Sequence, residues 1–158
     1  MPTTGDFAEL KALQRLLPRL GGEGRRRVSK QLALEAKDLV SEGFARGVSP
    51  AGVAWPPVRR GGQPLRDTGR LAASIMAQDN GKGFVLSTNV AYADVHQRGA
   101  VITVKKARSL YSPKLRQFFG KSVTIPARPF FPEGDSLPAA WTVRLDEAAQ
   151  DALDAFFG

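Results

Sequence analysis

The sequence predicts an α+β fold, in which a long N-terminal helix and a C-terminal helix pack on a small, mainly antiparallel sheet with long loops. Three observations carry this prediction. Apolar residues recur every three or four positions from about Glu23 to Arg46, and Gly47 is a good helix stop. Asn80-Gly81, a dipeptide typical of hairpin turns, separates two β-type runs. Helical spacing returns after Ser136 or Pro138 and continues to the C-terminus.

Two helices are predicted before the sheet. Within residues 1–22, apolar residues at helical spacing run from Phe7 to Leu20, and Gly21-Gly22 ends this segment. The second helix is roughly 30 Å long at 1.5 Å per residue. Arg25 to Arg27 stand at its N-terminal end, where the helix dipole disfavours cations, which indicates either a required contact or a later start. Its apolar face includes one acid among Val28, Leu32, Glu35, Leu39, Val40 and Phe44.

Residues 47–64 are predicted to form an extended loop. They contain four prolines and four glycines, which can continue neither a helix nor a central strand. Loops of this length inside a domain are often functional. Because a large aromatic side chain in a loop is usually anchored, Trp55 either fixes the loop to the core of its own subunit or forms a subunit contact.

The segment after this loop is predicted to form a short helix and then the strands of the sheet. Asp67 or Thr68 suits the helix N-cap, with Leu71 on the apolar face. Residues 105–120 are predicted to form a second long loop, which is basic with interspersed aromatics. The remaining elements are hairpin strands at 75–79 and 83–88, a short helical segment at 92–98 ending at Gly99, strands at 101–104 and 123–126, and an extended segment at 127–132.

Composition excludes several function classes. The chain has 158 residues with no Cys and one His, which excludes disulfides, thiolate metal sites and sites built from two imidazoles. No apolar run approaches the roughly 20 residues of a membrane span, and Met1 to Leu10 does not resemble a secretory signal. We expect a single domain over residues 1–158 that functions without a membrane, in a cytoplasm-like compartment.

The formal charge of +8 is unevenly distributed. Residues 1–64 carry 11 basic and 6 acidic side chains, residues 65–128 carry 11 and 3, and residues 129–158 carry 1 and 6. A basic body with an acidic tail suits contact with nucleic acid, docking of an acidic partner, or head-to-tail pairing of identical chains. A solvated surface that only favours solubility is the fourth interpretation.

Motifs for catalysis are sparse. Gly21 to Gly24 precedes a helix but lacks the Lys and hydroxyl residue of a phosphate-binding loop. His96 could act as a general base, but Asp94 and Arg98 lie on a different helical face and no nucleophile motif stands beside it. We therefore predict a protein that is not an enzyme and has no cofactor or metal site. The basic and aromatic loop at 105–120 suits single-stranded nucleic acid or an acidic partner.

Four segments stand in order between residues 44 and 131: Phe44-x5-Pro50-x-Gly52-x2-Trp55-Pro56-Pro57, Leu65-x2-Thr68-Gly69-x-Leu71-x2-Ser74-Ile75, Ala91-Tyr92-Ala93-x2-His96-Gln97-x-Gly99 and Ile125-Pro126-Ala127-Arg128-Pro129-Phe130. This succession resembles the phage virion morphogenesis family, the Mu G-like tail completion proteins of contractile-tailed phages and prophages. The match in order and spacing covers over half of the chain.

The resemblance implies a structural protein of the head–tail junction, or neck, needed to complete the tail or to join it to the capsid. It also implies a ring of identical subunits, with a hexamer favoured by tail symmetry and a dodecamer as the alternative. Other neck, connector or tail proteins would be its partners, in the virion and, during assembly, in the host cytoplasm. The competing interpretation is a basic nucleic-acid-binding module that contacts DNA in the neck without sequence specificity.

Seven residues of these segments are predicted as structural or subunit-contact positions. Thr68-Gly69 gives a helix start with little side-chain bulk. Flanking prolines hold Arg128 in an extended chain, and we expect its guanidinium to pair with a carboxylate, such as Asp94 or an acid of the C-terminal helix, either between subunits or within one subunit. Tyr92 and His96 lie four apart on one helical face. The seven are Trp55, Thr68, Gly69, Tyr92, His96, Arg128 and Phe130.

Overall fold

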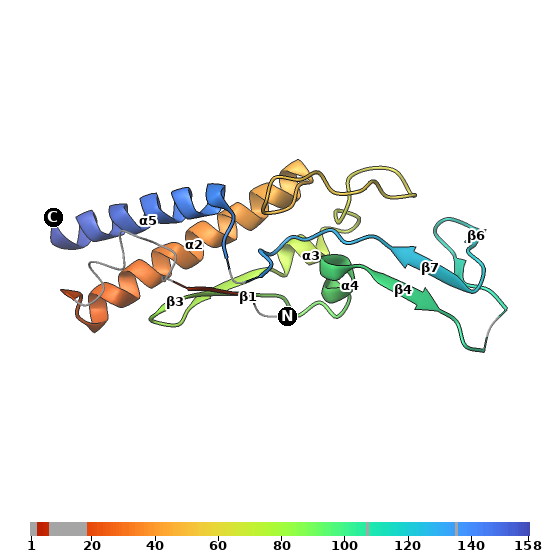
Figure 1. Cartoon of the computed structure of the whole chain (residues 1–158), viewed down its shortest axis with the longest axis horizontal. Helices are drawn as coiled ribbons and strands as arrows, with labels where there is room; N and C mark the ends of the chain where they lie inside the picture. The colour runs from red at the N-terminus through yellow and green to blue at the C-terminus, as the bar shows by residue number, and fades with distance from the viewer. Residues whose placement is uncertain (1–2, 7–18, 107, 135) are drawn as a thin grey trace.

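The computed structural model describes residues 3–6, 19–106, 108–134 and 136–158, arranged along one long axis (Figure 1). Two long helices and a three-stranded sheet form one end, and a narrow ribbon of strands extends from the other. The predicted α+β class is confirmed. The elements are β1 Thr3–Asp6, α2 Gly22–Arg46, α3 Arg70–Ala73, β2 Met76–Asp79, β3 Gly83–Ser87, α4 Ala93–Arg98, β4 Ala100–Thr103, β5 Tyr111–Ser112, β6 Gln117–Phe118, β7 Ser122–Ile125 and α5 Ala139–Phe157.

Helices α2 and α5 pack along each other and carry much of the core. Gly47 ends α2 in the left-handed conformation, at φ 69°, and its N–H bonds to the Gly43 carbonyl, so the predicted stop is confirmed. The acid on the apolar face of α2 has a partner, because Arg144 of α5 lies 2.6 Å from Glu35. Arg144 also contacts both carboxylate oxygens of Glu42 at 2.7 Å. These ion pairs join the two helices beside their apolar contact.

The arginines at the start of α2 do not delay the helix, which begins at Gly22. The interpretation of a later start is therefore wrong. Arg27 pairs with Glu23 at 3.3 Å and lies over the ring of Phe156, 5.6 Å from its centroid. An acid one turn earlier and an aromatic ring on α5 offset the unfavourable dipole.

The three-stranded sheet has the order β1-β3-β2 and is antiparallel throughout. Phe84 and Leu86 of the central strand are buried and face α2, as the alternation along a strand requires. The predicted hairpin around Asn80-Gly81 is confirmed. Strand β1 was not predicted, because Thr3–Asp6 carries no apolar alternation; part of the predicted N-terminal segment is thus a strand. The rest of the predicted helix, at residues 7–18, lies outside the described residues.

Two further predictions are corrected at the other end of the molecule. Helix α3 begins after Gly69, whose φ of 75° makes a sharp left-handed turn, so neither Asp67 nor Thr68 is its N-cap. The predicted loop at 105–120 contains the two-stranded hairpin β5–β6, which joins onto the β4–β7 ribbon. We call residues 100–125 the arm, and the remaining described residues the body.

Candidate functional site

An open hollow of about 750 Å³ lies where the arm leaves the body. The loop after α2, helix α3 and helix α4 form its walls. Five of the seven residues predicted from the sequence line it, while Trp55 and Phe130 lie beneath, in the core. The lining residues are Val58, Arg60, Leu65, Asp67, Thr68, Gly69, Arg70, Leu71, Tyr92, His96 and Arg128. We call this feature the junction hollow.

Trp55 anchors the proline-rich loop to the core of its own subunit. Its side chain is buried, and the indole nitrogen donates to the Pro129 carbonyl at 2.7 Å. Its ring meets Phe44 edge-on at 5.5 Å, and Phe44 in turn meets Phe130 at 5.6 Å. These aromatic contacts and the buried hydrogen bond tie the end of α2, the loop and the extended segment into one unit. A subunit contact by Trp55 remains a prediction.

Arg128 is a buried cross-link between the same two segments. It is 4% exposed; its Nε donates to the Pro56 carbonyl at 2.7 Å and its Nη2 to the Pro57 carbonyl at 2.8 Å. Within the subunit the expectation of a carboxylate partner is therefore wrong, since Asp94 pairs with Arg98 instead. Proline has no backbone N–H to donate, but its carbonyl still accepts, and the planar guanidinium bonds to two such carbonyls at once. Burial lowers the pKa of Arg128.

Gln97 has a central role that the sequence analysis did not assign to it. It is 1% exposed, and its Oε1 accepts from the N–H groups of Phe130 and Phe131, both at 3.0 Å. Its Nε2 donates to the Phe131 carbonyl at 2.9 Å and to Glu133 at 3.1 Å. The side-chain amide of Gln97 thus makes the backbone hydrogen bonds that a neighbouring strand would otherwise make to Phe130 and Phe131. Gln97 belongs to the segment Ala91 to Gly99 that resembles the family. Only the folded structure shows that the N–H groups of Phe130 and Phe131 need an acceptor.

Gly99 lets α4 pass directly against the extended segment. Its φ is 75° and ψ 167°, a combination that is essentially restricted to glycine. A Cβ at this position would lie 2.8 Å from both the Ala127 nitrogen and the Ile125 oxygen. Real Cβ atoms do not approach backbone so closely, so the close crossing requires glycine.

His96 lines the junction hollow. Its ring meets Tyr92 edge-on at 5.7 Å, and its Nδ1 has no hydrogen-bond partner in the described part of the chain. Burial, and second the positive charge of Arg128, lower the pKa of His96 below its ordinary 6.5. A base that is not oriented by a carboxylate lacks the geometry of a nucleophile-activating pair.

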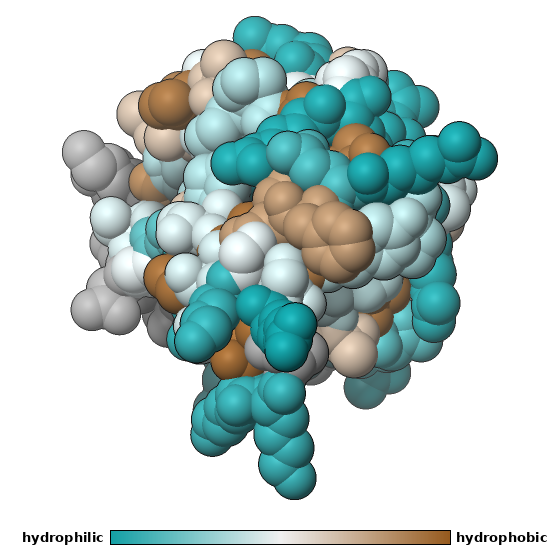
Figure 2. All heavy atoms as spheres, turned by 90° about the vertical axis from the view of Figure 1, so that its right-hand side faces the viewer, coloured by the Kyte–Doolittle hydropathy of each residue, from teal (hydrophilic) through white to brown (hydrophobic). Residues whose placement is uncertain are grey.

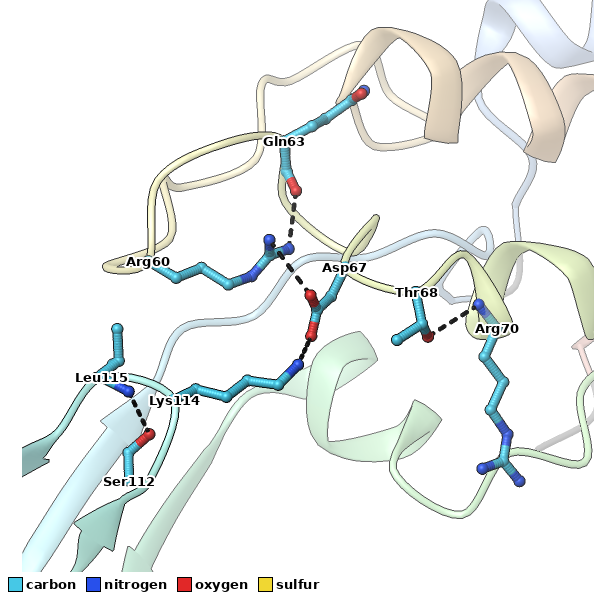
Figure 3. Close-up of polar contacts among 8 residues, drawn as sticks. All are labelled: Arg60, Gln63, Asp67, Thr68, Arg70, Ser112, Lys114 and Leu115. Carbon is cyan, nitrogen blue, oxygen red and sulfur yellow. Dashed lines mark hydrogen bonds and ion pairs between the residues drawn. The ribbon is translucent and has the colours of Figure 1, made fainter.

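The outer wall of the junction hollow is held by charges (Figure 3). Asp67 accepts from Lys114, in the turn between β5 and β6, and lies 3.8 Å from Arg60. The hydrogen bond from Lys114 is the main cause that lowers the pKa of Asp67. Thr68 Oγ1 accepts from the Arg70 nitrogen at 3.4 Å, beside the left-handed Gly69. The Lys114–Asp67 ion pair and the contact of Arg59 with the Phe119 ring, at 5.2 Å, connect the loop of the body to the arm.

The chemistry of this region is that of positioning. Across residues 3–6, 19–106, 108–134 and 136–158, no three His, Asp or Glu side chains are grouped as a metal site would require. The polar groups of the hollow bind backbone carbonyls and each other. Cross-links of this kind hold segments of the subunit in place.

Comparison with known proteins identifies the family of this chain. Residues 8–138 match the model of the phage virion morphogenesis family, and the chain belongs to that family. The "Mu-like prophage FluMu G protein 2" of Haemophilus influenzae is 34% identical over 102 residues, which cover 64% of this chain and 61% of that protein. The match thus spans about three fifths of the relative's length. No solved structure matches the chain.

The chain is therefore a phage structural protein of virion morphogenesis, and the family predicted from the four segments is confirmed. The family places it with the virion. No helix in the described residues is long and apolar enough to cross a membrane.

Proposed function

We propose that this protein completes the tail or joins it to the head, as a ring of identical subunits in the neck. Family membership and the likeness to a Mu-like prophage G protein support a morphogenesis role. A hexamer, with tail symmetry, is the favoured ring and a dodecamer the alternative. Neck, connector or tail proteins are its proposed partners.

One observation carries the proposal of assembly: the arm is uncovered. None of its described residues is buried. Phe118, Val101 and Tyr111 are 69%, 67% and 51% exposed. Figure 2 looks onto this end of the molecule and shows apolar surface at its centre, framed by hydrophilic side chains. Several exposed apolar side chains on one projecting element make it a candidate interaction site.

The test is complementation of a prophage from which this reading frame has been deleted. Supplied in trans, the wild-type chain is expected to restore infectious particles, whereas the deletion alone yields heads and tails that electron microscopy shows unjoined or incomplete. Normal, joined particles from the deletion strain would contradict the proposal. Mass photometry of the purified chain, alone and with tail proteins, tests the ring, which at six copies of 17.0 kDa has a mass of about 102 kDa.

A second candidate function, contact with DNA in the neck, is favoured by the composition of the arm. Its described residues include six cations and no acid, and Tyr111 and Phe118 lie 4.8 Å apart on the tip hairpin. Cations with adjacent aromatics suit single-stranded nucleic acid. Binding of a labelled oligonucleotide that weakens steeply with salt supports this function, and no binding at low salt excludes it.

A further inference from the structure

We infer that the arm of one copy docks on the outer face of α5 of the next copy. This inference rests on the proposed ring and names the two surfaces that would form it. The arm supplies the first surface. A two-stranded ribbon is marginally stable by itself in water, and this one leaves apolar side chains bare, with Ile102 41% exposed beside Val101. An element built in this way is completed by a partner.

The charge of the arm defines what that partner must carry. Between Asp94 and Glu133 the sequence has no acidic residue. One cation, Lys114, is held by Asp67. The exposed cations at the far end of β4 are Lys105, Lys106 and Arg108. The partner surface is therefore acidic, with apolar side chains among its carboxylates.

Helix α5 presents such a surface. Glu147, Asp151 and Asp154 are all exposed, and their spacing of four and three places them on one face. Exposed apolar residues stand at its ends, with Val143 57% and Phe157 65% exposed. Asp154 accepts from Gln150 at 2.9 Å, a neutral partner that leaves its charge in place.

The single cation of α5 does not neutralise this stripe. Arg144 points the other way, into its ion pairs with Glu35 and Glu42 on α2. The opposite face of α5, with Trp141 and Leu145, is buried in the body. The charged side chains of the outward stripe are thus all acidic in the described helix.

The two surfaces cannot meet within one subunit. The arm forms one end of the long axis and the C-terminal half of α5 the other (Figure 1). A contact between them joins two copies head to tail. Such a contact uses a different patch on each side, and it closes into a ring when the rotation between copies allows. The partner that binds the arm is accordingly a second copy of this chain.

The test is a pair of charge reversals and their mixture. The arm variant carries Lys105→Glu, Lys106→Glu and Arg108→Glu, and the helix variant carries Glu147→Lys, Asp151→Lys and Asp154→Lys. Each alone sets like charges across the contact, and we expect its self-association to weaken at least about tenfold in mass photometry. In an equal mixture both contacts become complementary, and assembly with alternating copies is expected to return.

The outcomes separate this inference from the proposed function. Circular dichroism first confirms that each variant is folded. Variants that assemble like the wild type, or a mixture that does not restore assembly, overturn the docking while the ring stands. A wild-type chain that stays monomeric, alone and with tail proteins, overturns the ring itself. An arm variant that loses only salt-dependent DNA binding also overturns the docking and assigns the arm to nucleic acid.

Discussion

The body and the arm of this protein have opposite construction. In the body, large apolar side chains such as Phe131 and Leu145 are fully buried, and polar ones such as Gln97 and Arg128 are buried with their hydrogen bonds made. In the arm, no described residue is buried and aromatic rings stand in solvent. The residues of the body are explained by the stability of the subunit, whereas those of the arm are the ones that we propose to bind a partner.

The junction hollow is the boundary between these two regions. The segments that resemble the family meet there, and their residues fix the direction in which the arm leaves the body. Gln97 and Arg128 hold the extended segment that continues from β7, while Gly99 precedes β4. Both strands of the ribbon are thus anchored at their base. We predict that damage at the base costs stability and damage in the arm costs assembly.

The largest loss of stability is expected from Gly99→Ala. The added Cβ would meet backbone on two sides at 2.8 Å, and the positive φ adds strain. We expect a loss of about 3 kcal/mol or more in the free energy of unfolding, measured with urea. Gly81→Ala is the control, because its φ is also 75° but nothing lies within 4 Å. An equal loss in both variants would show that the close crossing is unimportant.

Gln97→Leu is expected to follow, with a loss of about 3 kcal/mol. The substitution leaves the buried N–H groups of Phe130 and Phe131 without an acceptor, and unmade buried hydrogen bonds cost about 1–3 kcal/mol each. Urea unfolding measures the loss, and Gln78→Leu, on the exposed part of β2, serves as the matched control. If the two variants are equally stable, the hydrogen bonds of the Gln97 amide do not stabilise the extended segment.

Arg128→Lys is expected to destabilise by about 2 kcal/mol, since an ammonium cannot reproduce the two parallel bonds of a guanidinium. Arg98→Lys, at an exposed ion pair with Asp94, is expected to change stability by less than about 0.5 kcal/mol. Thermal unfolding of the two variants side by side decides the matter. A wild-type melting temperature for Arg128→Lys would contradict the buried cross-link.

A smaller, pH-dependent effect is expected from His96, the one histidine of the chain. Its pKa in the folded protein lies below the ordinary 6.5, so the unfolded chain binds the proton more readily. Stability should therefore fall as the pH drops from 7.5 through 6.5, and level off below the folded pKa. Melting temperatures across this range measure the effect, and His96→Gln should remove it. A slope that persists in the variant would assign the titration to other groups.

The smallest effect on stability is expected from shortening the arm. Thr103 and Ser122 are opposite each other in the ribbon, so Asn-Gly in place of residues 104–121 closes it with a two-residue turn. None of the described side chains removed is buried, and we expect the melting temperature to change by less than about 4 °C. A large drop in differential scanning calorimetry would show that the tip stabilises the body.

Much of the fold could be predicted because local signals agree with the tertiary structure. Gly47 stops α2 and Asn80-Gly81 turns the hairpin, and in both cases the residue type alone specifies the backbone. The tip hairpin β5–β6 was missed because its two-residue strands are too short for a periodic pattern. Strand β1 was missed because its extended conformation is determined by pairing with β3, while its own residues carry no strand pattern.

Most residues of the candidate site could be predicted from the sequence, but their hydrogen-bond partners could not. Five of the seven residues meet at the junction hollow. The partners of Arg128 are carbonyl groups, which every residue carries, so no sequence pattern could specify them. The role of Gln97 depends on an extended segment that lacks a strand partner, and this need exists only in the folded chain.

In our proposal, the arm serves assembly and not the stability of the subunit. The most direct measurement is the yield of infectious particles when the chain with the shortened arm complements the prophage deletion. We expect a folded protein that restores few or no particles, with heads and tails left unjoined or incomplete. Wild-type yields from the shortened chain would contradict it.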